Sequence, residues 1–249
     1  QEDLGRLLVL LGEAQLALGN RAAAERWLLT ARQQLDASDA LNGAALTALG
    51  RVRFEEGNIT EAWEYFSAAV TNFPNTDSFV AALVGKGESE ARLGDFGQSL
   101  ATYEQAVEYV RRPVFGEPDP EPLRSSLTRQ HETRYNQSDF ETALQYAQLE
   151  RRLYDRKLPN PLLKRLALTH ERISREILGL TDDPGAEPTA VNLNQQQRVA
   201  VAGHFESAAQ YYHQHAMAMV VVDSEEYGES LWRAADCYDK AGMHRSEEH

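Results

Sequence analysis

Residues 46–76 read LTALGRVRFEEGNITEAWEYFSAAVTNFPNT, and a break at Gly57 divides this stretch into two helical patterns. Small and bulky apolar residues recur every three or four positions on each side of the break, which puts each set on one face of a helix. They are Leu46, Leu49 and Gly50 before the break and Ala62, Phe66 and Ala69 after it. The stretch therefore predicts a helix, a tight turn and a second helix that ends at Pro74.

The same pattern recurs on both sides of this hairpin. The matching residues are Leu8, Leu11, Gly12, Gly19, Ala24, Leu28 and Ala31 in a first repeat, and Leu83, Gly87, Gly94, Ser99, Tyr103 and Ala106 in a third. The successive turn glycines Gly19, Gly57 and Gly94 are 38 and 37 residues apart. Three repeats in phase predict stacked helical hairpins, and no run of residues alternates as a sheet strand would.

This pattern of Leu-Gly, a turn glycine, alanine, an aromatic residue and a further alanine resembles the tetratricopeptide repeat family. The resemblance implies an all-α, right-handed superhelical α-solenoid of helix-turn-helix repeats, each about 34 residues long in the family. Two positions depart from the family's pattern. Arg53 stands where an aromatic residue is usual, and Lys86 occupies an apolar position.

Residues 1–112 are thus expected to form three regular repeats, and residues 113–180 an irregular middle section. This section contains a degenerate fourth repeat, in which Ser138 replaces the turn glycine and the second helix reaches about Arg156. It also contains an irregular or inserted helix over Pro161–Leu178.

Residues 181–249 are expected to form a loop, a further repeat and the first helix of a truncated repeat. The loop covers Thr181–Asn192, and the two repeats are expected to turn at Gly203 and Gly242. Strict alternation of helices offers another assignment, in which residues 161–178 form a first helix and residues 192–202 the second helix of the same hairpin.

The composition of the 249 residues is that of an ordinary globular protein, with 42% hydrophobic and 25% charged residues. Lys plus Arg number 25 against 38 Asp plus Glu, which gives a net charge of −13. This charge disfavours nucleic acid as a partner and favours a basic or neutral one. Because Cys237 is the single cysteine, the chain has no intrachain disulfide and no cysteine-based zinc site.

The compartment is not determined by the sequence. No apolar run approaches the roughly 18 residues that a membrane helix needs, so direct membrane insertion is not expected. The chain starts at Gln1 without an initiator Met and stops soon after a new repeat begins, as a fragment of a larger protein would. The cytoplasm and the bacterial cell envelope or periplasm are equally compatible with these features.

In the tetratricopeptide family the first helix of each hairpin lines a concave face that binds polypeptides. The resemblance implies the following partner-binding residues: Glu13, Arg51, Phe54, Glu88, Glu132, Tyr135, Trp232 and Asp236. Four of them are acidic and occupy equivalent positions, which predicts a groove for an extended or helical segment carrying Lys or Arg. The alternative is a solvated acidic face with no ligand.

No catalytic residue, cofactor or metal site is expected. His213 and His215 are two residues apart, so on a helix they point about 200° apart and do not share a metal ion. Gly85-Lys86-Gly87 lacks the other residues of a phosphate-binding loop.

The function expected is therefore a protein–protein interaction scaffold or adaptor rather than an enzyme. Two alternatives stay open: a recruiting segment of a larger enzyme or signalling protein, and a self-assembling structural protein that stacks through the ends of its solenoid.

Overall fold

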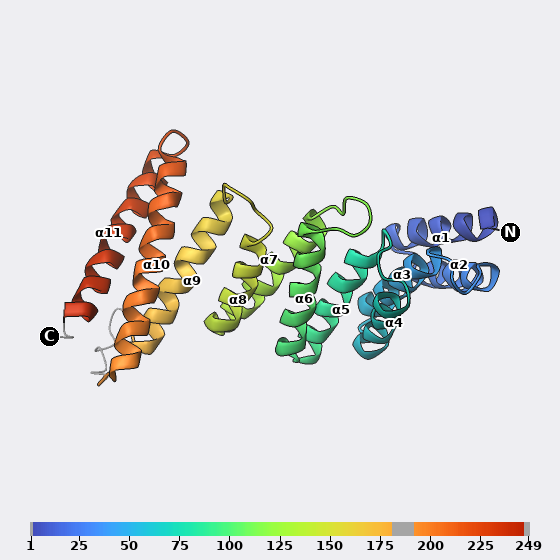
Figure 1. The fold of residues 1–249 in the computed structure, drawn as a ribbon, viewed down its shortest axis with the longest axis horizontal. Helices are drawn as coiled ribbons and strands as arrows, with labels where there is room; N and C mark the ends of the chain where they lie inside the picture. Colours follow the sequence, from blue (N-terminus) through green and yellow to red (C-terminus); the bar gives the residue numbers. More distant parts are fainter. Residues whose placement is uncertain (1, 181–191, 247–249) are drawn as a thin grey trace. The chain divides into compact units, whose positions relative to one another are not determined.

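The computed structural model describes residues 2–180 and 192–246, and every regular element in these two ranges is an α-helix (Figure 1). The helices are α1 (Glu2–Ala17), α2 (Arg21–Gln34), α3 (Leu41–Glu55), α4 (Ile59–Asn72), α5 (Phe79–Leu93), α6 (Phe96–Arg111), α7 (Glu121–Asn136), α8 (Phe140–Arg151), α9 (Asn160–Ile177), α10 (Gln195–Met219) and α11 (Ser224–Ser246). The all-α prediction is confirmed for this part of the chain.

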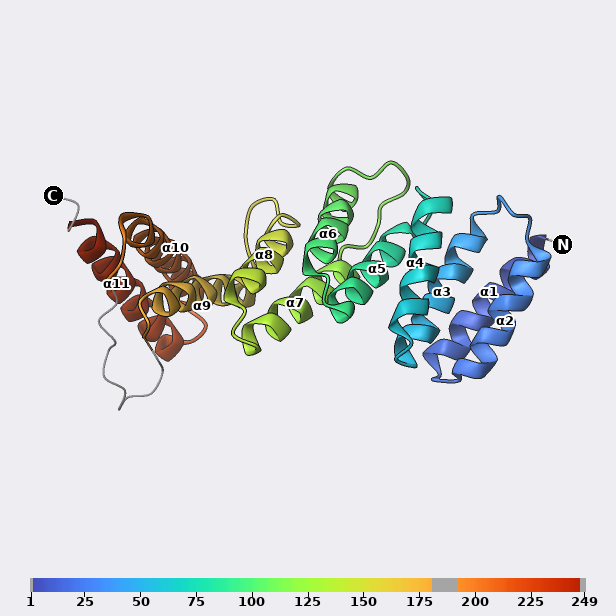
Figure 2. The same ribbon diagram turned by 90° about the horizontal axis from the view of Figure 1, so that it is seen from below.

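The chain divides into an N-terminal unit, residues 1–130, and a C-terminal unit, residues 131–249. In the N-terminal unit α1 pairs with α2, α3 with α4 and α5 with α6 (Figure 2). Each hairpin packs on the next through α2 with α3 and α4 with α5. The first helices α1, α3 and α5 also contact one another, so they form one layer of the stack.

One turn geometry closes the first four hairpins. Gly19, Gly57 and Gly94 adopt positive φ angles of 78°, 84° and 87°, and Ser138 adopts 61° in the fourth turn. The amide of the next residue, an Asn or Asp, donates to a carbonyl five residues back, as Asn58 does to Arg53 at 2.9 Å. This is a Schellman-type helix ending, which needs a left-handed residue. The prediction that Ser138 replaces a turn glycine is confirmed.

Small residues lie where the two helices of a hairpin cross. A Cβ atom added to Gly12 would lie 2.6 Å from the side chain of Leu28, and one added to Gly50 would lie 2.7 Å from Phe66. Gly87 has the same relation to Tyr103, at 2.9 Å. The partner is 16 residues after the glycine each time. This constant offset means that the three hairpins share one packing arrangement.

The two departures from the repeat pattern form polar links between helices. Arg53 binds Glu25 of α2, Glu56 at 2.7 Å and Glu61 of α4 at 3.0 Å. It therefore joins two hairpins where an aromatic residue would pack.

The second departure is a buried network. Lys86 binds Glu90 at 2.7 Å, and Glu90, which is only 4% exposed, accepts hydrogen bonds from Thr102 at 2.7 Å and Trp63 at 3.1 Å. Because each buried charge has a partner, the polar residues are tolerated between α4, α5 and α6.

In the C-terminal unit each helix from α8 to α11 packs on the next. The helix predicted over Pro161–Leu178 is confirmed as α9, and apolar residues such as Leu166, Ala167 and Ile173 are buried against α8 and α10. The prediction that the preceding helix reaches Arg156 is wrong, because α8 ends at Arg151. Tyr154 and Leu158 leave the helical path and pack against the α8–α9 core.

The turns predicted at Gly203 and Gly242 are also wrong, because α10 and α11 run through these glycines. Each true turn glycine precedes Asn or Asp, which begins the next helix, whereas Gly203 precedes His204 and Gly242 precedes Met243. A glycine inside a helix costs only about 1 kcal/mol. The continuous buried face of α10, which includes Val201, Phe205, Ala208, Ala209 and Tyr212, outweighs that cost. The loop predicted over Thr181–Asn192 falls, except for its last residue, outside the described residues.

Candidate interaction surface

The exposed side of the first-helix layer, formed by α1, α3 and α5, carries the predicted residues of the N-terminal unit. Glu13 of α1 and Arg51 of α3 are both exposed and interact electrostatically. Partial desolvation raises the pKa of the Glu13 carboxyl above its ordinary value, and the positive charge of Arg51 opposes this shift. The two side chains thus form one mixed-charge position.

Phe54 and Glu88 are less accessible to a binding partner than the sequence suggested. The guanidinium of Arg92 lies 5.3 Å from the centre of the half-buried Phe54 ring. The carboxylate of Glu88 binds Arg129 of α7 and accepts a hydrogen bond from Ser126 at 2.5 Å, and its side chain is 15% exposed. The exposed charges beside these two residues are therefore guanidinium groups.

The predicted residues of the C-terminal unit lie on two helices. On α7, Glu132 is exposed, while Tyr135 stacks on His131 and contacts Phe140 edge-on. On α11, Trp232 is 68% exposed, and Asp236 binds Lys240 at 2.6 Å. Four acidic residues are predicted to line the groove. Among the described residues, Glu132 is the one of these four for which the structure shows no basic partner.

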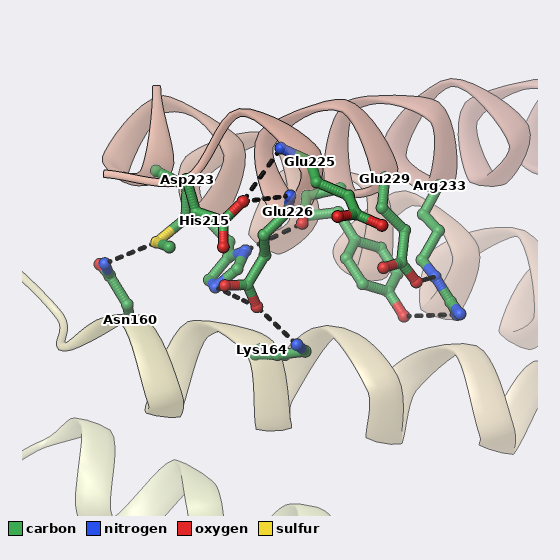
Figure 3. Close-up of polar contacts among 11 residues, drawn as sticks. Asn160, Lys164, His215, Asp223, Glu225, Glu226, Glu229 and Arg233 are labelled. Carbon is green, nitrogen blue, oxygen red and sulfur yellow. Dashed lines mark hydrogen bonds and ion pairs between the residues drawn. The ribbon is translucent and has the colours of Figure 1, made fainter. Parts of the chain in front are cut away.

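A cavity of about 240 Å³ in the C-terminal unit was not predicted. Its lining residues are Leu168, Glu171, Arg172, Arg175 and Arg233. Glu171 accepts a hydrogen bond from the Tyr212 hydroxyl at 2.7 Å and lies 3.4 Å from Arg233. Arg233 also binds Glu229 at 3.0 Å (Figure 3). The three arginines come from two helices, α9 and α11, so the sequence of neither helix alone predicts this cavity.

No family model and no curated protein sequence matches the chain. Among solved structures, it is similar to a TPR-repeat protein of Bacteroides fragilis at 14% identity, over 94% of this chain and 97% of that one, with a TM-score of 0.47. A tetratricopeptide repeat protein of Parabacteroides merdae matches at 15% identity, over 97% and 93% of the two chains, with a TM-score of 0.47. The TPR2AB domain of yeast Sti1, solved in complex with pHSP90, matches at 12% identity, over 97% and 100%, with a TM-score of 0.41.

Three histidines of the C-terminal unit, His131, His170 and His215, are buried. His215, 2% exposed, shares a 2.9 Å hydrogen bond with Ser230, and its other ring nitrogen lies 3.8 Å from Glu226, which binds Lys164 at 2.6 Å (Figure 3). A serine, a histidine and a glutamate thus form a chain of side-chain contacts, but Ser230 is only 4% exposed. A buried hydroxyl has no access to substrate, so the cluster joins α9, α10 and α11 rather than forming an active site.

Neither a metal cluster nor a membrane-spanning helix is found in the described part of the chain. His170 and His204 lie 2.9 Å apart between their Nδ1 atoms, but no third acidic, histidine or cysteine ligand joins them there. None of the described helices combines the length and the hydropathy needed to cross a bilayer.

Proposed function

We propose that this chain is a non-catalytic scaffold that binds a polypeptide segment on the exposed side of α1, α3 and α5. The observation that supports this most is a layer of three first helices whose exposed side carries charged groups above small residues. On that side Ala44 and Ala81 have short apolar side chains, whereas Glu13, Arg51 and Arg92 have long charged ones. A low apolar floor with charged rims suits an extended or helical peptide.

The ligand we propose is basic, and it competes with the protein's own arginine. Glu88 is the predicted acidic residue of α5, and Arg129 binds it in the free chain. A Lys or Arg of the ligand replaces Arg129 at Glu88, helped by the long-range field of a protein with a net charge of −13. Because Arg129 is 61% exposed, its release to solvent costs little.

Three matched variants test this proposal on a partner captured from the native source. Glu88→Gln is expected to weaken binding about tenfold, and Arg129→Gln to strengthen it by removing the competitor. Glu64→Gln, which removes an exposed carboxylate from the second helix α4, should leave affinity unchanged. Titration by calorimetry measures all three. The opposite order for Glu88→Gln and Arg129→Gln would show an acidic ligand, and equal affinities for all variants would place the binding site elsewhere; either result overturns the proposal.

A further inference from the structure

The first helix of the chain is apolar on two sides, and only one of them is covered. One side of α1 packs on α2 and α3 through residues such as Leu8, Val9 and Leu16. The other side, here called the α1 seam, consists of Leu4, Leu7, Leu11, Ala14 and Leu18. Leu4, Leu7 and Leu18 are 48%, 60% and 72% exposed. Three of the four leucines of the α1 seam are thus exposed, and Leu11 is half-buried.

Inside the stack, three of these five positions are covered by a helix. In α3, Ala45, Leu49 and Val52 lie 38 residues after Leu7, Leu11 and Ala14, and they are 0%, 1% and 0% exposed. The preceding helix α2 packs on α3. The α1 seam therefore has the residues of a helix-packing surface without the helix that would cover it.

The last helix carries a second uncovered stripe, made largely of small residues. This α11 seam consists of Gly228, Leu231, Ala235, Tyr238 and Gly242. Leu231 and Tyr238 are 37% and 47% exposed, and the three small residues are exposed as well. The other side of α11 packs on α10 through Ala234, Cys237 and Ala241.

The glycines of the α11 seam make no close contact within the part of the chain that the structure describes. A Cβ atom added to Gly12, Gly50 or Gly87 would collide with a neighbouring helix, whereas one added to Gly228 or Gly242 would meet nothing within 4 Å. Glycine inside a helix is unfavourable, so it suits positions where another backbone comes close. Among the described residues, none supplies such a backbone at Gly228 or Gly242.

The two seams match in spacing and complement each other in volume. Both have successive intervals of three, four, three and four residues, and each spans 14 residues, or about 21 Å of helix. This is the spacing of two helices that pack side by side along a heptad seam. The α1 seam has four leucines and one alanine, while the α11 seam has two glycines and one alanine that leave room for bulky side chains.

We propose that α1 of one copy of this chain packs on α11 of a second copy, so that copies join head to tail. This contact uses a different surface from each copy, so it is heterologous: it builds a ring where the rotation between copies closes and an open chain where it does not. It is separate from the proposed peptide site, because neither seam includes a residue of the exposed α1–α3–α5 side used there.

The contact should be weak and should strengthen with salt. One helix pair is smaller than the about 800 Å² per partner of a standard specific interface, so we expect dissociation constants in the upper micromolar range. Each copy has a net charge of −13, and the resulting repulsion is screened as salt rises. Binding of a basic peptide responds to salt in the opposite direction, which separates the two proposals.

Analytical ultracentrifugation of paired variants tests the head-to-tail contact. Leu4→Gln with Leu7→Gln disables the α1 seam, and Ala235→Gln with Tyr238→Gln disables the α11 seam, both without a change in charge. The unmodified chain should associate into dimers or larger oligomers as its concentration approaches about 1 mM. Each variant alone should lose association at least tenfold, and an equimolar mixture should form dimers and nothing larger, because one intact contact remains.

A control and two contrary results complete the test. Val114→Gln with Phe115→Gln removes exposed apolar groups from the α6–α7 loop and should associate as the unmodified chain does. Circular dichroism confirms that each variant keeps its helix content. An unmodified chain that stays monomeric at all concentrations and salt levels would overturn the proposal. So would dimers formed by either seam variant alone, since these require like seams to pair.

Discussion

Acid should destabilise the C-terminal unit because its buried histidines resist protonation. Burial, reinforced by positive neighbours, lowers the pKa of His131 and of His170 to about 4. The neighbours are Arg165 for His131, and His204 and Arg151 for His170. In the unfolded chain both groups return to about 6.5. The folded state therefore binds fewer protons than the unfolded state between about pH 6.5 and about pH 4, so the free energy of unfolding falls as the pH drops through this range.

The magnitude follows from the two pKa values. At pH 5 an unfolded histidine is almost fully protonated and a folded one with a pKa of about 4 is almost neutral, so each of the two residues costs about 2 kcal/mol relative to pH 8. Together they remove about 4 kcal/mol, a large share of the stability of a typical domain. His204 and His215, whose pKa values burial also lowers, act in the same direction.

Urea unfolding at pH 8 and pH 5 measures this loss, and NMR titration of the histidine C–H resonances checks its cause. A His131→Gln variant retains a hydrogen-bonding group toward Thr169, which His131 contacts at 2.9 Å, and should lose less stability between the two pH values. The N-terminal unit has no histidine and serves as the internal control. If His131 and His170 titrate near pH 6.5 in the folded protein, the reasoning is refuted.

Three further predictions concern packing, turns and the cysteine. Gly50→Ala should lose about 1–3 kcal/mol of stability because its Cβ would meet the Phe66 ring, whereas Gly203→Ala, in open space within α10, should gain about 1 kcal/mol; thermal unfolding compares the two. Ser138→Gly should stabilise the protein by about 0.5–1 kcal/mol because it relieves a left-handed serine, and a loss in urea titration would contradict the turn assignment. Burial, together with the nearby carboxylates of Glu171 and Asp236, raises the pKa of the Cys237 thiol to about 12. A thiol reagent at pH 8 should therefore modify Cys237 only when the C-terminal unit unfolds. Rapid labelling of the native protein would contradict this prediction.

The regular hairpins could be predicted because their signals are local. A left-handed glycine followed by Asn or Asp ends one helix and begins the next, and this pair is readable in the sequence at Gly57 and Asn58. The glycine and aromatic pair that nests two helices also recurs at a fixed offset. The spacing of Gly203 and Gly242 predicts turns, but neither glycine is followed by Asn or Asp, and both lie inside helices.

The candidate site was less predictable because its charges pair across helices. The offsets of Glu13 and Glu88 place both residues on first helices, but they do not reveal that Arg51 lies near one carboxylate and Arg129 binds the other. The arginine-lined cavity joins residues of α9 and α11 that are about 60 positions apart in the chain. Such pairings depend on tertiary packing, which a periodic pattern does not contain.

Site-specific photocrosslinking tests the central claim of a polypeptide-binding first-helix face. A photoreactive amino acid replaces Ala81, exposed on α5 in the proposed binding face, and in a matched protein it replaces Gln105, exposed on the second helix α6. In the presence of the captured partner, we expect a covalent adduct with the partner polypeptide at position 81 and little or none at position 105. Equal yields at both positions, or an adduct at position 105 alone, would contradict the claim.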